Sequence, residues 1–108
     1  MSEPMKIRAH VTADLAEIRV LMSHPMETGR RQDAEGKLVP EHYIRNVTID
    51  VAGRRVLTTQ WGMAVAKNPF LGIRVRGAKV GDKVVVTWAD TAGDSRTDEA
   101  VLAPKPSA

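Results

Sequence analysis

The sequence contains no cysteine among its 108 residues. Disulfides, zinc–thiolate sites, iron–sulfur clusters and every reaction that needs a thiolate on this chain are therefore excluded. Aromatic residues are also scarce, at 4% of the chain, and Tyr43, Trp61, Phe70 and Trp88 are scattered along it. Binding of single-stranded nucleic acid needs aromatic platforms beside a basic groove, so the sequence disfavours that function.

Basic residues are in slight excess but form no run. The 16 basic and 13 acidic residues leave a net charge of +3, and the two signs are interleaved. This pattern predicts no nucleic-acid partner and at most a mild attraction for small anions. No apolar run approaches the roughly 18 residues of a membrane span, so no membrane contact is expected. The first ten residues lack the sections of a secretory signal, which taken alone favours a cytoplasmic location.

No segment shows a sustained helical period, and strand signals recur at short spacing. Seven short strands joined by polar turns predict an all-β, immunoglobulin-like (E-set type) antiparallel β-sandwich. With no internal repeat and no linker, residues 1–108 are predicted to form one domain, with frayed ends near 1–4 and 103–108. The alternation of apolar and polar residues places these strands at 5–10, 15–23, 43–51, 56–60, 68–77, 83–90 and 96–102.

Alternation also predicts which side chains face the core. In residues 43–51, Tyr43, Val47, Ile49 and Val51 are expected to share one face of the strand. In residues 83–90, Val84, Val86 and Trp88 alternate with Val85, Thr87 and Ala89 in the same way.

The longest segment without a strand signal is SHPMETGRRQDAEGKLVP, residues 23–40. Long structured loops in compact domains are more often functional than idle, so this segment is predicted to be a binding surface. Arg30 and Arg31 are candidates for contacting anionic surfaces or ligands, because the planar guanidinium matches oxyanions. The competing interpretation, of equal weight, is that both arginines pair with Asp33 and Glu35 and stiffen the loop.

Catalysis finds little support in this segment. Ser23 and His24 are adjacent, so an extended backbone would point them to opposite sides. No third residue that could orient the histidine is evident from the sequence. His24 is instead expected to cap a backbone group or to hold the base of the loop.

Two other hypotheses stay open at this point. Met22, His24 and Met26 alternate, and thioether and imidazole ligands suit Cu(I), which predicts a copper site. Against copper, Met22 also fits the inward end of a strand through Ile18 and Val20, since methionine often fills gaps in a core. The other hypothesis is an anion-binding enzyme that uses Arg30, Arg31 and His24.

Three blocks of this sequence have a family resemblance. SHPMETGRRQDAEGKLVP is similar to the hallmark segment of SoxZ, a subunit of the bacterial sulfur-oxidation (Sox) system. NPF at residues 68–70 resembles that family's Asn-Pro-aromatic element, and WADTAG at 88–93 resembles its Trp-x-Asp-x-x-Gly strand and turn. The blocks fit the family's spacing from Lys6 to Leu102. The chain departs from its relatives in carrying valine where they tend to carry phenylalanine, at Val47, Val51, Val84 and Val86.

The resemblance implies an immunoglobulin-like fold and a role without catalysis, cofactor or metal. It implies a heterodimer with SoxY, the subunit that carries the sulfur intermediate on a cysteine, and transient contact with the cytochrome, the thiosulfohydrolase and the sulfur dehydrogenase of the pathway. It further implies a periplasmic location, reached by export with the partner, and a possible homodimer of the isolated chain. The residues predicted to dock partners are His24, Pro25, Met26, Glu27, Thr28, Gly29, Arg30, Arg31, Asp33 and Gly36.

Overall fold

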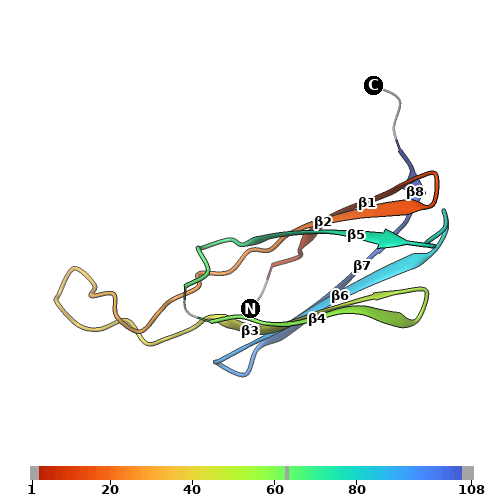
Figure 1. Ribbon diagram of the computed structural model, residues 1–108. Coiled ribbons are helices and arrows are strands. Elements are labelled where there is room, and N and C mark those ends of the chain that lie inside the picture. Colours follow the sequence, from red (N-terminus) through yellow and green to blue (C-terminus); the bar gives the residue numbers. More distant parts are fainter. Residues whose placement is uncertain (1–2, 63, 106–108) are drawn as a thin grey trace.

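Two four-stranded sheets pack face to face in the computed structural model, which describes residues 3–62 and 64–105 (Figure 1). One sheet has the order β5-β2-β1-β8 and the other has the order β4-β3-β6-β7. All neighbouring strands are antiparallel except β1 and β8. The prediction of an all-β, immunoglobulin-like sandwich is confirmed. The strands are β1 Lys6–Thr12, β2 Leu15–Leu21, β3 Ile44–Val51, β4 Arg54–Gln60, β5 Phe70–Arg76, β6 Lys83–Asp90, β7 Ser95–Val101 and β8 Ala103–Pro104.

The core lies between the sheets and is built mainly from β2, β3 and β6. Successive side chains of a strand point to opposite faces, so every second residue of these strands is buried. The predicted inward face of β6 is confirmed, and Met22 is completely buried as the predicted continuation of β2. Val47, Val51, Val84 and Val86 are all core residues.

The inward face of β3 differs from the prediction at its first residues. Val47, Ile49 and Val51 are buried as expected, but Tyr43 is only partly buried and Ile44 is fully buried instead. The cause is a register shift between Ile44 and Asn46, where β3 pairs with β6. A β-bulge adds one residue to a strand and so reverses the alternation before it.

The C-terminal segment is more ordered than predicted. Ala103 and Pro104 form an eighth strand that pairs in parallel with His10 and Val11 of β1, and the Lys105 N–H donates to the Val11 carbonyl at 3.2 Å. The predicted fraying is therefore wrong for residues 103–105, because the open edge of β1 offers backbone groups that need partners. Residues 106–108, and 1–2 at the other end, lie outside the described residues.

The connection between β2 and β3 leaves the sandwich at one end and extends well beyond it (Figure 1). Its outer part, residues 27–42, is called the arm below. Two isolated antiparallel bridges, Glu27 with His42 and Gln32 with Leu38, hold the outgoing and returning halves of the arm together. No helix in residues 3–62 and 64–105 is long and apolar enough to cross a membrane.

Candidate functional site: a buried hub at the root of the arm

The chain enters the arm through alternating buried and accessible residues. Met22, His24 and Met26 are all buried, whereas Pro25 between them is exposed. The predicted alternation is therefore confirmed, but these three side chains point into the sandwich. His24 and Met26, which were expected among the docking residues, are 4% and 5% exposed and so offer little surface to a partner.

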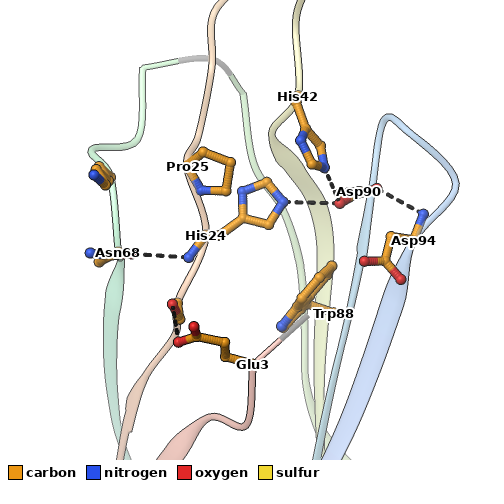
Figure 2. A pocket seen from close by; sticks show the side chains of 10 residues that line it. Glu3, His24, Pro25, His42, Asn68, Trp88, Asp90 and Asp94 are labelled. Atoms are coloured by element: carbon orange, nitrogen blue, oxygen red, sulfur yellow. Dashed lines mark hydrogen bonds and ion pairs between the residues drawn. The ribbon is translucent and has the colours of Figure 1, made fainter. Parts of the chain in front are cut away.

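Asp90, at the end of β6, is the centre of a hydrogen-bonded cluster that also contains His24 and His42 and is called the hub below. Figure 2 shows both imidazole rings directed at this one carboxylate. Asp90 Oδ2 lies 2.9 Å from His24 Nε2 and 2.7 Å from His42 Nε2. Asp90 Oδ1 accepts the backbone N–H groups of Ala92 and Asp94 at 3.0 and 2.9 Å. The hub thus ties both ends of the arm to the β6–β7 turn.

The hydrogen bonds of His24 determine its tautomer. Its Nδ1 lies 3.1 Å from the backbone nitrogen of Met26, which can only donate, so Nδ1 accepts. The ring proton of neutral His24 is then on Nε2, which donates to Asp90. The prediction that His24 caps a backbone group and holds the base of the loop is confirmed.

The carboxyl group of Asp90 is ionised by its surroundings. Burial acts to raise its pKa, but the hydrogen bonds from His24, the Asp94 backbone and His42 outweigh burial and hold the pKa below its ordinary value. A buried carboxylate with four donors is stable as an anion because each donor replaces a water molecule.

Hydrogen bonds from residues around the hub also fix the backbone of the chain where it enters and leaves the arm. The His24 N–H donates to Asn68 Oδ1 and the Asn68 N–H donates to the His24 carbonyl, both at 3.0 Å. Met26 has a left-handed backbone with φ of 50°, which is uncommon for a residue of its size. On the returning half, the Thr91 N–H donates to the Tyr43 carbonyl and the Tyr43 N–H donates to Thr91 Oγ1. The three sequence blocks singled out above therefore meet at the hub.

The ligand atoms of His24, His42 and Asp90 lie within 4.8 Å of one another, as in some metal sites. However, a metal on His24 Nε2 would displace the proton to Nδ1, where it would face the Met26 N–H, another donor. The hydrogen bonds therefore disfavour metal binding at the hub. The copper prediction from Met22, His24 and Met26 is not supported either, since both His24 nitrogens are engaged and Met26 Sδ lies 3.4 Å from the Ile44 nitrogen.

Ser23 and His24, the candidate catalytic pair, do not contact each other through a hydrogen bond. The Ser23 hydroxyl donates to Glu3 at 3.1 Å and has no bond to His24. A cleft of about 410 Å³ opens beside the hub (Figure 2). Among the described residues, the only buried side-chain nitrogen or oxygen without a partner is Trp88 Nε1. An indole N–H can donate a hydrogen bond but cannot act as a base or a nucleophile.

The tip of the arm is organised by Asp33. One oxygen of its carboxylate accepts the backbone N–H groups of Glu35 and Lys37 at 2.9 and 3.0 Å. The Gly36 N–H donates to the Asp33 carbonyl, and the Val39 N–H donates to the Arg31 carbonyl. These local bonds shape the turn without burying it: every residue from 30 to 38 is exposed, and Leu38 is 62% exposed.

The two arginines of the arm differ in their partners. Arg31 Nε donates to both carboxylate oxygens of Glu27 at 3.0 Å, so it pairs within the arm but not with the predicted Asp33 or Glu35. The Arg30 side chain has no hydrogen-bond or ion-pair partner among residues 3–62 and 64–105. The structure does not bring Arg30, Arg31 and His24 together, as the anion-binding enzyme requires. Pro25, Glu27, Thr28, Gly29, Arg30, Arg31, Asp33 and Gly36 stay candidates for docking.

His42 and Asp90 are the two hub residues that sequence reasoning missed. Asp90 lies in the WADTAG block, but nothing in that block showed that its carboxylate faces two histidines 48 and 66 residues away. The pairing of β3 with β6, which brings these segments together, is visible only in the fold.

Comparison with known proteins gives one family. The family model described as Sulphur oxidation protein SoxZ matches residues 5–101, which include all three blocks. No curated protein matches the chain.

Proposed function

The chain belongs to the SoxZ family, which makes it a subunit of a sulfur-oxidation system, and from that premise we propose that it is the non-catalytic scaffold of a sulfur carrier complex. In this proposal it binds the cysteine-bearing carrier subunit, SoxY in the family, as a heterodimer. It also helps to dock the pathway enzymes, namely the cytochrome, the thiosulfohydrolase and the sulfur dehydrogenase. The complex works in the periplasm, and this subunit is exported together with its partner.

The observation that carries the proposal is the arm, whose sequence is the longest family block and whose root is fixed by the hub. Hydrogen bonds from His24 and His42 to one buried carboxylate hold the ends of the arm, and two from the β6–β7 turn fix that carboxylate, while residues 30–38 offer their side chains to solvent. A surface held in its bound shape loses less conformational entropy on binding. A firmly rooted, exposed arm therefore suits repeated docking.

The chemistry of the chain supports a scaffold role. The 108 residues contain no thiol that could carry the sulfur intermediate. His24, the histidine of the predicted anion-binding enzyme, has both ring nitrogens engaged in internal hydrogen bonds. A general base must reach the proton that it abstracts, and His24 reaches only Met26 and Asp90.

Co-purification with a cysteine-bearing carrier subunit from the same cell tests the proposal. A permanent pair of this kind buries well over about 1,000 Å² in total, so we expect a stable one-to-one complex that survives gel filtration at micromolar concentration. The complex should be absent when the carrier is omitted or scrambled. Failure to form it at that concentration would contradict the scaffold role.

A homodimer of the isolated chain is a second expectation, because the surface meant for the carrier is left uncovered. Sedimentation of the purified chain should show self-association that disappears when the carrier is added. Monomers alone at micromolar concentration would contradict it.

A further inference from the structure

The outer face of the sheet formed by β1, β2 and β5 carries an unusual set of side chains. Alternation buries Ile18 and Val20 and turns their neighbours outward. Five of the outward side chains are cations and only one, Glu17, is an acid. This surface, called the basic face below, consists of Lys6, Arg8, Glu17, Arg19, Leu21, Phe70, Gly72, Arg74 and Arg76.

The cations of the basic face are poorly compensated. Arg8 of β1 lies directly opposite Arg19 of β2 in the strand register. Like charges in facing positions of a sheet destabilise it. Arg19 bonds to Glu17 at 2.5 Å. Across the described part of the chain, Lys6, Arg8, Arg74 and Arg76 have no side-chain hydrogen bond or ion pair.

Two exposed apolar side chains lie among these charges. Phe70 of β5 lies opposite Leu21 of β2, and their exposed fractions are 61% and 41%. A Cβ atom on Gly72 would lie 3.4 Å from Phe70 Cε1, so the Phe70 ring lies over Gly72, which has no side chain to displace it. Shallow grooves border Phe70 on both sides, one lined by Arg19, Gly72 and Arg74, the other by Lys6, Arg8 and Leu21.

We propose that the basic face docks an acidic protein surface that places an apolar side chain beside Phe70. Carboxylates of the partner would pair with arginines that have none in this chain, and an aromatic side chain would cover Phe70 and Leu21. The face favours a protein over nucleic acid, because the exposed Phe70 and Leu21 offer an apolar contact that a phosphate chain cannot fill. It also has one aromatic ring, too few to stack successive bases.

Such a face suits a transient partner. Charge complementarity across an interface mainly raises the association rate, whereas permanent interfaces are more apolar. The inference goes beyond the carrier role and does not depend on it. Variants of the basic face should still co-purify with the carrier subunit.

The test is a titration of the isotope-labelled full-length chain, followed by amide NMR shifts. The probe is a Glu-rich peptide with one central tryptophan, and the matched probe has serine in place of that tryptophan. We expect shifts confined to β1, β2 and β5 and strongest near Phe70 and Gly72. Binding should weaken at high salt, because exposed charges are screened.

Variants of the chain separate the contribution of the cations to binding from that of Phe70. Arg8→Ser and Phe70→Ser should each weaken binding of the tryptophan peptide by about threefold or more, and Phe70→Ser should abolish its advantage over the serine peptide. Arg54→Ser and Val101→Ser, exposed positions in the other sheet, should leave binding unchanged. All four side chains are solvent-accessible, and the spectrum of each variant reports whether it is folded.

Three outcomes would overturn the proposal. In the first, shifts spread over both sheets and Arg54→Ser weakens binding as much as Arg8→Ser, which indicates diffuse attraction of charge. In the second, single-stranded DNA or anionic phospholipid vesicles bind the basic face more tightly than the peptide and displace it. In the third, the tryptophan and serine peptides bind equally tightly and Phe70→Ser does not weaken binding.

Discussion

The root of the arm, at His24 and His42, is tied to a buried carboxylate, whereas the tip, residues 30–38, is exposed along its whole length. Both parts contain an aspartate that accepts backbone N–H groups. Asp90 is buried and has four donors, while Asp33 at the tip is exposed and has two on its side chain. In water a lost hydrogen bond is largely replaced, but in the interior it is not. The same residue type therefore stabilises the fold at the root and only shapes a turn at the tip.

The comparison predicts that, among the variants below, a substitution of Asp90 lowers the free energy of unfolding most. Asp90→Ala leaves His24, His42 and two backbone N–H groups without their acceptor, and should lower the free energy of unfolding by about 3–5 kcal/mol. Asp33→Ala is the matched control and should cost less than about 1 kcal/mol, because water replaces the carboxylate. Urea denaturation measures both. Similar losses for the two variants would contradict the contrast between root and tip.

The next largest loss of stability is expected from a substitution of Gly29, within the arm. Its φ is 84° and an added Cβ would lie 3.2 Å from Glu41 Cβ on the returning half, so Gly29→Ala introduces both backbone strain and a close contact. Gly36→Ala has a similar φ of 82° but meets nothing within 4 Å. We expect the first to cost about 1 kcal/mol more than the second. Amide exchange of Glu27 and His42 should quicken only in Gly29→Ala, and equal behaviour would show that the halves are not in contact.

A pH experiment sharpens the account of the hub. Because the pKa of Asp90 is lower in the folded chain, its contribution is present above the unfolded pKa, about 3.9, and is lost as the pH falls through the folded pKa. His42→Phe removes one of the bonds that lower this pKa, so acid unfolding should begin at a higher pH. Arg55→Gln removes the exposed partner of Asp50 and should move the onset less, because solvent screens that pair. Circular dichroism against pH measures the shift, and an unchanged midpoint in His42→Phe would contradict the role of His42.

The smallest effect on stability belongs to the tip. Arg30→Ser and Leu38→Ser replace exposed side chains and should change the free energy of unfolding by less than about 0.5 kcal/mol. Thermal unfolding of each variant checks this expectation. A large loss would show that the tip packs against the sandwich and is not available to a partner.

The strands were predictable from sequence where a local pattern determines them. The alternation Val84, Val86, Trp88 gave the inward face of β6, because burial of apolar side chains on one face is a property of neighbouring residues. The bulge that buries Ile44 in place of Tyr43, and the pairing of Ala103 with His10, depend on which strands meet and left no local signal.

The candidate site was predictable in its position but not in its chemistry. The length and turn residues of 23–40 predicted a binding loop, and the spacing of His24 and Met26 indicated a common direction. The same spacing is compatible with copper binding and with burial, and the partners decided between them. Met26 Sδ lies against the Ile44 nitrogen, and His24 finds Asp90 far along the chain.

The central claim, that the rooted arm docks the pathway enzymes, is tested most directly by enzyme kinetics on the reconstituted carrier complex. The complex is loaded with its sulfur intermediate and supplied to each pathway enzyme, with the scaffold as wild type, Arg30→Ser or Leu38→Ser. The account predicts an intact complex in every case and, for at least one enzyme, a KM raised by about threefold or more at unchanged kcat. Unchanged KM for all enzymes with both variants would contradict it.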